Sequence, residues 1–229
     1  MRAIILAAGL GSRLRPITNN IPKSLISVNN KPLIETQIEY LHDIGINDIV
    51  IVTGYLSEKF AYLRDKYGVK TVFNEFYSSF NNIYTMSLVI DLLPNSYVID
   101  ADVFMCRNFL DNTLTYSCYF SGLKKTINEW QIIHDDNKKV VDIKSSNGLG
   151  LILSGVSFWS YEDGNILNIK LKEKISKEPE KWKTLYWDDI VKENLHTLNV
   201  KFHEINTNDW FEIDSVDDYE DVLNLYPNK

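Results

Sequence analysis

The chain has 229 residues, of which 45% are hydrophobic and 24% charged, and its 31 acidic and 24 basic side chains give a net charge of -7 at neutral pH. A chain of this length and composition can bury a sizeable core as one or at most two domains. Its negative charge argues against a nucleic-acid partner or an anionic membrane, because both favour a basic face. No obligate protein partner is evident from the composition.

Cysteine and histidine usage indicates neither a zinc site nor a disulfide framework. Cys106 and Cys118 form no C-x-x-C pair, and the four histidines are scattered. So few cysteines fit a reducing compartment. We see no basic-then-apolar leader before the first strand and no apolar run of membrane-spanning length. We therefore expect a cytoplasmic protein with no membrane partner.

The first twenty-five residues carry the strongest functional signal. An apolar run at residues 4–8 predicts a buried parallel strand, and Gly9 and Gly11 follow it directly. Glycines let the backbone turn sharply and present N–H groups to phosphate oxygens. Arg13, and Lys23 behind a proline, add positive charge at two fixed places. The segment predicts a site that grips a nucleoside triphosphate.

Two other phosphate-binding motifs do not fit this segment. A dinucleotide fingerprint needs a third glycine where Leu14 stands and an acidic residue about twenty positions further on, where Glu35 falls inside a helical pattern. A Walker loop needs Gly-Lys-Ser/Thr, which is absent. A NAD-dependent enzyme is therefore disfavoured, whereas an ordinary glycine turn with solvent-facing cations stays open as an alternative.

Strand-like and helix-like segments then alternate along the chain. Helical spacing of apolar residues follows Pro32 and stops at Gly45, and a second strand follows at residues 48–53. The same alternation continues to an acidic strand end at Asp102. It predicts a Rossmann-like α/β fold. Its further elements are a helix at 57–67, a strand at 69–73, a helix at 85–93 and a strand at 97–102.

The second half of the chain has a more antiparallel pattern. Short strands are predicted at residues 115–122, 130–134, 140–143 and 151–160, with a turn at residues 135–137 and a charged helix to about residue 175. We therefore expect one domain over 1–229. Its central sheet would be mixed and mostly parallel, flanked by helices, with a small antiparallel subregion on the acceptor side. Residues 1–104 would mainly bind the nucleotide and residues 105–229 mainly the acceptor.

Two pairs of carboxylates could hold a divalent cation. Asp100 and Asp102 point to one face if both lie in a strand, and Asp102 is the better ligand candidate. Glu212 and Asp214 are spaced in the same way near the C-terminus, and Asp214 would meet Asp102 across the metal. Ser215 reads equally as the N-cap of a helix, and both interpretations can hold together.

A polar and aromatic segment between strand and helix is expected to border the base and ribose. Amide groups there could read a pyrimidine edge and a ring could stack on it. For any single residue, an ordinary turn is a slightly better explanation. The candidates are Asn74, Phe80, Asn81, Asn82, Tyr84 and Ser87.

Aromatic rings beside carboxylates are typical of a site for a quaternary ammonium group. Ring faces attract such a cation by roughly 0.5–2 kcal/mol each, and a carboxylate adds charge attraction without requiring a hydrogen bond. Trp187 also fits a buried helical stripe, and an acidic first turn would suit that helix in any case. The segments concerned contain Glu129 and Trp130, and Tyr186, Trp187, Asp188 and Asp189.

The N-terminal pattern L-A-A-G-x-G-x-R-L-x-P followed by P-K is filled at every position, and in it the chain resembles the sugar-phosphate nucleotidyltransferase family. Residues 1–102, 153–159, 186–188 and 212–215 extend the resemblance to the bacterial branch that makes CDP-choline from CTP and phosphocholine for surface polysaccharide. The resemblance implies direct in-line displacement at the α-phosphorus of CTP, with Mg²⁺ as cofactor and pyrophosphate as leaving group.

The resemblance also implies a role for individual residues. Lys23 would contact phosphate, and Asp102 and Asp214 would hold Mg²⁺. The nucleotide would lie on Leu6, Ala8 and Gly9, and the choline head among Trp130, Tyr186, Asp188 or Asp189, and Glu212.

Two alternatives to phosphocholine transfer remain open at this point. The acceptor could be phosphoethanolamine, 2-aminoethylphosphonate or a sugar 1-phosphate, since a primary ammonium relies more on carboxylates than on rings. The chain could also be a regulatory module that binds a nucleotide without reacting it, although the intact set of loop glycines, cations and carboxylates argues against that.

Overall fold

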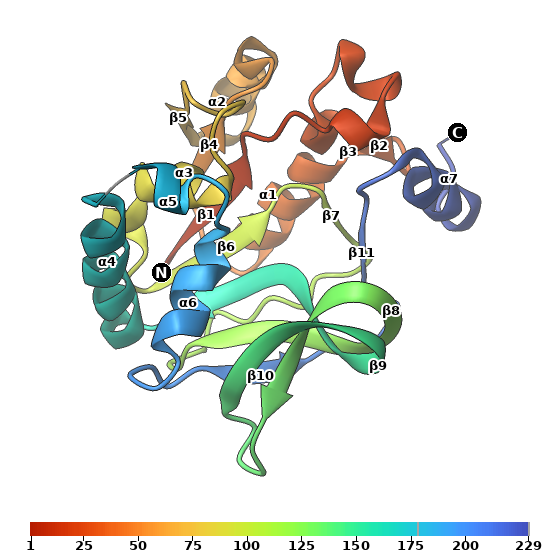
Figure 1. Cartoon of the computed structure of the whole chain (residues 1–229). Helices are drawn as coiled ribbons and strands as arrows, with labels where there is room; N and C mark the ends of the chain where they lie inside the picture. Colours follow the sequence, from red (N-terminus) through yellow and green to blue (C-terminus); the bar gives the residue numbers. More distant parts are fainter. Residues whose placement is uncertain (178, 229) are drawn as a thin grey trace.

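The computed structural model describes residues 1–177 and 179–228, except for the side chains of residues 179 and 180. Within this part of the chain a seven-stranded sheet forms the centre of the molecule, in the order β10-β8-β9-β6-β1-β4-β5 (Figure 1). Four neighbouring strands run parallel: β1 (Arg2–Ala7), β4 (Ile49–Thr53), β5 (Lys70–Phe73) and β6 (Ser96–Asp100). The long strands β8 (Cys118–His134) and β9 (Val140–Trp159) are antiparallel, β9 also to β6, and β10 (Lys201–Glu204) is parallel to β8.

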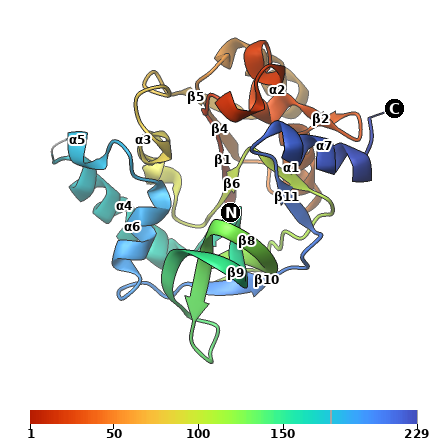
Figure 2. The same ribbon diagram turned by 45° about the vertical axis from the view of Figure 1, so that its right-hand side comes forward.

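Helices cover both faces of the sheet because successive residues of its buried strands point to opposite sides. In β1, Ala3 and Ile5 pack with α1 (Leu33–Asp43) and α2 (Ala61–Tyr67) on one face. Ile4 faces the other way, toward a second helical layer (Figure 2). That layer contains α3 (Asn82–Ser87), α4 (Tyr161–Ile175), α5 (Pro179–Trp182) and α6 (Trp187–Asn194). None of the helices in the described residues has the length and apolar character to cross a membrane.

Two small antiparallel sheets lie beside the main one. β2 (Ser27–Val28) pairs with β3 (Lys31–Pro32), and β7 (Val103–Met105) pairs with β11 (Trp210–Glu212). The final helix, α7 (Val216–Leu225), packs with the glycine-loop region in a third apolar cluster. This cluster contains Leu14, Ile26, Val28, Leu33, Phe104, Ile213 and Val222.

The expected α/β fold with a mixed, mostly parallel sheet is confirmed, and the deviations are local. The strand predicted at 97–102 ends at Asp100, and Asp102 lies in the turn that leads to β7. The helix predicted at 85–93 starts three residues earlier and gives way to a 3-10 turn at Ile90–Leu92. The four short strands predicted between residues 115 and 160 are two long strands, joined at the turn that was expected at 135–137.

The β8–β9 hairpin curls over on itself, which the alternation of residues does not reveal. Asn128 and Gly148 have φ of 57° and 102° at the bend. As a result, Gln131 pairs with Lys144 and also with Ile152 further along β9. The curl carries the following half of β8 back across the sheet, where it lines the cleft described below.

Candidate active site

The glycine loop leaves the carboxyl end of β1 and forms one wall of a pocket of about 280 Å³. A Cβ placed on Gly9 would meet no atom within 4 Å, so this position opens onto free space. Gly11 has a φ of 59°, and its carbonyl accepts a hydrogen bond from the Thr18 hydroxyl at 2.7 Å. The loop therefore keeps a fixed shape beside an open volume. The lining includes Leu6, Ala7, Ala8, Gly9, Leu10, Lys23 and Ser24 from this side.

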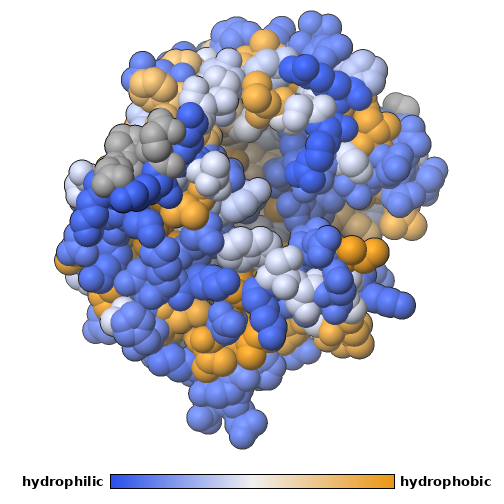
Figure 3. Space-filling model, viewed as in Figure 1, coloured by the Kyte–Doolittle hydropathy of each residue, from blue (hydrophilic) through white to orange (hydrophobic). Residues whose placement is uncertain are grey.

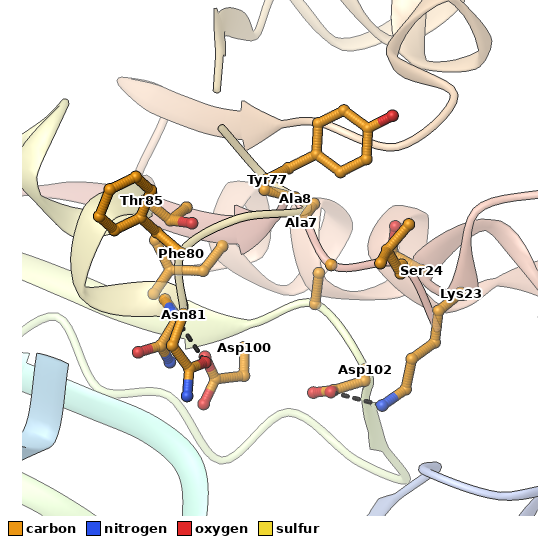
Figure 4. A pocket seen from close by; sticks show the side chains of 15 residues that line it. Ala7, Ala8, Lys23, Ser24, Tyr77, Phe80, Asn81, Thr85, Asp100 and Asp102 are labelled. Carbon is orange, nitrogen blue, oxygen red and sulfur yellow. Dashed lines mark hydrogen bonds and ion pairs between the residues drawn. The ribbon is translucent and has the colours of Figure 1, made fainter. Parts of the chain in front are cut away.

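The opposite wall of this pocket comes from the start of α3 and the loop before it. Phe80, Asn81 and Asn82 line it together with Tyr77 and Thr85 (Figure 4). The ring of Phe80 stacks on other aromatic side chains, with ring centroids 5.2 Å from Tyr84 and 4.9 Å from Trp182. Asn82 accepts a hydrogen bond from the backbone N–H of Trp187 at 2.8 Å. The wall is thereby tied to α6, which belongs to the second half of the chain.

A cluster of opposite charges lies at the open end of the pocket. The Lys23 ammonium group stands 2.7 Å from Asp102 Oδ2 and also contacts Asp214 Oδ1, and Figure 4 shows the first of these contacts. Arg13 Nη2 lies 2.9 Å from Asp214 Oδ2. Burial alone would lower the pKa of Lys23, but the charges of Asp102 and Asp214 outweigh it and raise that pKa above its usual range. Lys23 is therefore a permanent cation at this point.

The same cluster offers a site of the right chemistry for a divalent cation. Oxygen atoms of Asp102, Glu212 and Asp214 lie within 4.8 Å of one another. Asp102 Oδ1 is buried and has no hydrogen-bond partner in the described part of the chain. Carboxylate oxygens are the ligands that Mg²⁺ prefers. Loss of hydration and the negative charges of Asp102 and Asp214 raise the pKa of Glu212 to about 8. A bound cation would relieve the repulsion among these carboxylates.

A second pocket, of about 370 Å³, adjoins the first and shares Asn82, Asp100 and Asp102 with it. Figure 3 shows a hollow near the middle of this face of the molecule. Trp130 from the curled part of β8 and Tyr186 from the start of α6 stand edge to face, with ring centroids 6.1 Å apart. Carboxylates line the same pocket as these rings, which makes the pocket suited to a cation without hydrogen-bond donors. Its lining includes Arg13, Tyr119, Glu129, Trp187, Asp188, Glu212 and Asp214.

The carboxylate of Asp188 is turned into this pocket and is not an exposed helix-start residue. It accepts a hydrogen bond from the Tyr119 hydroxyl at 2.7 Å. Loss of hydration raises the pKa of Asp188 to about 7, although the hydrogen bond from Tyr119 opposes the shift. A bound cation would favour its ionised form.

Most of the residues predicted from the sequence therefore line one of the two pockets. Trp187 also does so, but only 4% of its surface is exposed and it packs on Trp159 with ring centroids 5.4 Å apart. Five predicted residues line neither pocket. Two of them belong to the polar and aromatic segment: Asn74 donates its side-chain amide to the Thr85 hydroxyl at 3.0 Å, and Tyr84 stacks on Phe80. The other three are Gly11, which follows the lining loop, Ser87, whose hydroxyl donates to the Tyr84 carbonyl, and Asp189, whose carboxylate accepts from the Tyr186 amide.

Several lining residues were not singled out in the sequence. Tyr77 precedes Phe80 in a predicted loop, and Ser24 follows Lys23 directly, so their positions could have suggested them. Tyr119 is an interior strand residue with no sequence signal that it would meet Asp188 from α6. Its contact depends on how β8 and α6 pack, which a local pattern does not encode.

A glycine loop with two cations follows one parallel strand and faces a carboxylate cluster built from the turn after a second parallel strand and from the end of β11. This arrangement defines an enzyme that transfers nucleotidyl groups. Residues 2–99 match the nucleotidyl transferase family model. The chain is 49% identical to the choline-phosphate cytidylyltransferase of Streptococcus pneumoniae over the whole of both chains, and 43% identical to that of Haemophilus influenzae over 100% of this chain and 99% of the relative. It is 34% identical to the 2-aminoethylphosphonate cytidylyltransferase of Lancefieldella rimae, over 93% of this chain and 88% of that one.

A solved structure of the CTP:phosphocholine cytidylyltransferase from Streptococcus pneumoniae has the same fold. It superposes with a TM-score of 0.94 at 48% identity and covers 98% of each chain. The chain belongs to the nucleotidyl transferase family, and these full-length relatives are cytidylyltransferases.

Proposed function

We propose that the chain transfers CMP from CTP to phosphocholine, giving CDP-choline and pyrophosphate. The observation that carries this proposal is the junction of the two pockets at Asp100 and Asp102. One pocket has the glycine loop and the cations that a triphosphate needs, and the other has the ring pair of Trp130 and Tyr186. The two choline-phosphate cytidylyltransferases to which the chain is similar over its full length support the same acceptor.

The chain's own residues supply alignment and charge for an in-line displacement. A phosphate oxygen of phosphocholine forms a bond to the α-phosphorus of CTP. The bond from that phosphorus to the oxygen that joins it to the β-phosphorus breaks, and pyrophosphate leaves with that oxygen. Lys23 and Arg13, which contact Asp102 and Asp214 beside the nucleotide pocket, would stabilise the negative charge on the phosphates as it develops. No general base is needed, because a phosphate monoester loses its second proton at about pH 6.

We propose that Asp102 and Asp214, with Glu212 beside them, hold Mg²⁺. The orphaned Asp102 Oδ1 and the three close carboxylates support this assignment. When bound, the ion would act as a Lewis acid on the phosphate oxygens. Lys23 and Arg13 would then turn from the two aspartates toward the triphosphate, because the ion replaces them as the partner of the carboxylates.

The choline head is assigned to the second pocket, where its methyl groups would lie against Trp130 and Tyr186. Asp188, Glu129 and Glu212 would supply the negative charge there. The runner-up acceptor is 2-aminoethylphosphonate, on which the relative from Lancefieldella rimae acts. Its primary ammonium group needs hydrogen-bond acceptors more than ring faces, and the edge-to-face pair of Trp130 and Tyr186 favours the methylated head.

The test is pyrophosphate release in the presence of Mg²⁺ with each of the four ribonucleoside triphosphates. Phosphocholine, phosphoethanolamine, 2-aminoethylphosphonate and glucose 1-phosphate serve as parallel acceptors. We expect the highest kcat/KM for CTP with phosphocholine. A preference for another acceptor would refute the assignment of the aromatic pocket to choline, while the assignment as a nucleotidyltransferase would stand. No release with any pair would indicate a nucleotide-binding module without catalysis.

A further inference from the structure

Gln37 is a fully buried polar residue in an otherwise apolar row of α1. Leu33 and Leu41, four positions to either side, share its side of the helix and are also buried. A buried amide is costly unless its polar groups find hydrogen-bond partners. The apolar row offers none. Gln37 Oε1 has no hydrogen-bond partner among the described residues, and the partners of Nε2 come from the segment that packs against α1.

Both amide hydrogens of Gln37 are donated to the turn that carries Asp102. Nε2 lies 3.0 Å from the carbonyl oxygen of Asp100 and 2.8 Å from that of Val103. A side-chain amide nitrogen has two hydrogens, so the donor capacity is fully used. Asp100 is the last residue of β6 and Val103 the first of β7, and Ala101 and Asp102 form the whole link between them.

The rest of this link is held by two other strands. The amide of Ala101 donates to the Leu6 carbonyl of β1 at 3.1 Å, and the carbonyl of Asp102 accepts from the amide of Ile213 at 3.2 Å. Gln37 provides the third attachment, from the side of α1. With the backbone fixed in this way, Asp102 Oδ1 is left buried and without a partner among the described residues.

We infer that Gln37 is a positioning residue that sets the direction of the Asp102 carboxylate for the divalent cation. The inference rests on the metal site assigned under the proposed function. Residues that orient metal ligands in this way typically change metal affinity or activity by about 10–100-fold when they are replaced. Gln37 itself lines neither pocket. It would act on Asp102 through the backbone carbonyls of Asp100 and Val103, on either side of that residue.

Two substitutions separate positioning from packing. Gln37→Met keeps about the same volume and apolar contact but removes both donors. Gln37→Glu keeps the size and places acceptors against the two carbonyl oxygens. Ile38→Ala is the matched control, because Ile38 is the next residue of the same helix, is equally buried and lies in the apolar core. It should lower stability without affecting the turn.

The first quantity to measure is the Kd of the Mn²⁺ complex of α,β-methylene CTP, determined by electron paramagnetic resonance. The bridging carbon of this analogue prevents turnover. The half-saturating Mg²⁺ concentration in the turnover assay is measured in parallel, and it does not depend on the fraction of protein that is folded. We expect both values to rise 10–100-fold in Gln37→Met and Gln37→Glu and to stay within twofold of the wild type in Ile38→Ala.

Unchanged metal dependence in a folded Gln37→Met protein would overturn the inference. If that variant does not fold, Gln37→Asn takes its place, because it keeps the amide but shortens its reach. A 10–100-fold rise in the Kd and in the half-saturating Mg²⁺ concentration would then support the inference, and unchanged values would overturn it. A wild-type protein that binds no Mn²⁺ with the nucleotide would refute the metal site itself, which is a separate failure.

Discussion

Ile213 donates its backbone amide to the backbone carbonyl of Asp102 across 3.2 Å. This hydrogen bond continues the pairing of β7 with β11, in which Glu212 lies opposite Val103. It brings two segments more than a hundred residues apart into register, so that the carboxylates of Asp102 and Asp214 face the same point. A short two-strand sheet therefore builds the charged centre of the site.

Replacing Lys23 by methionine should have opposite effects on turnover and on metal binding. Turnover should fall by at least about 10²-fold, because a cation aimed at the phosphates is lost. Mn²⁺ should bind the nucleotide-free protein more tightly than the wild type, because Lys23 no longer occupies Asp102 and Asp214. Mn²⁺ titration and pyrophosphate release measure the two quantities.

Lys66→Met is the control for Lys23→Met, since Lys66 pairs with Glu35 at 2.6 Å in another part of the molecule. It should change neither turnover nor Mn²⁺ affinity. Near-normal turnover in Lys23→Met, or weaker Mn²⁺ binding in the nucleotide-free state, would contradict the role assigned to Lys23.

Trp130→Ala should weaken the binding of phosphocholine and leave the binding of CTP unchanged. Loss of one ring from a cation site corresponds to roughly 0.5–2 kcal/mol, or a rise of about 2–30-fold in KM for phosphocholine. KM for CTP should stay the same, and Trp130→Phe should retain part of the affinity. Steady-state kinetics with both substrates measures this. An unaltered KM for phosphocholine in Trp130→Ala would exclude the ring from the acceptor site.

Affinity for the choline head should increase with pH around neutrality. The pKa of Asp188 is raised to about 7 by loss of hydration, so this carboxylate is mostly neutral at pH 6 and mostly ionised at pH 8. The ionised form attracts the cation, and binding of choline should tighten by up to about tenfold over this interval. Free choline is the ligand to titrate, because the phosphate of phosphocholine ionises in the same range.

Asp188→Asn should remove this pH dependence. The pKa of Asp188 is higher in the folded state than in the unfolded state, so between about pH 4 and about pH 7 the folded state binds a proton that the unfolded state has lost. The free energy of unfolding therefore falls as the pH rises through this range. Denaturant unfolding should therefore show Asp188→Asn gaining stability over the wild type across that range. Choline binding by the wild type that is equal at pH 6 and pH 8 would show that Asp188 does not face the cation.

Ser215→Ala should affect the helix and leave the metal site alone. The Ser215 hydroxyl accepts a hydrogen bond from the Asp218 amide at 3.2 Å and caps α7. Its loss should cost about 1 kcal/mol of unfolding free energy, with the half-saturating Mg²⁺ concentration unchanged. Asp214→Asn should do the reverse. Equal metal effects in both variants would show that the cap and the metal ligand are not separable.

The sequence predicts the nucleotide side of the site well because that side is local. Gly9, Arg13 and Lys23 lie within fifteen residues of one another, and the order of strands and helices around them follows from apolar periodicity alone. The acidic end of the strand that leads to Asp102 also follows from this order. The position of Asp214 after β11 does not, because β7 and β11 are too short to be recognised from a pattern.

The acceptor side could be predicted only as a set of residue types. Trp130 reaches the cleft because Gln131 pairs with two different parts of β9, which is a non-local contact with no period in the sequence. The hydrogen bond from Tyr119 to Asp188 joins residues 69 positions apart and depends on packing between β8 and α6. For the same reason the attachment of Gln37 to the Asp102 turn was invisible in the helical pattern of α1.

If the nucleotide pocket and the aromatic pocket form one active site, a single molecule of CDP-choline should occupy both of them, and its equilibrium binding can be measured. Isothermal titration calorimetry should give a Kd for CDP-choline at least about tenfold lower than for CMP, because the product fills both pockets at once. Trp130→Ala should remove most of this difference. CDP-choline that binds the wild type no more tightly than CMP would contradict the account, since the aromatic pocket would then take no part in holding the product.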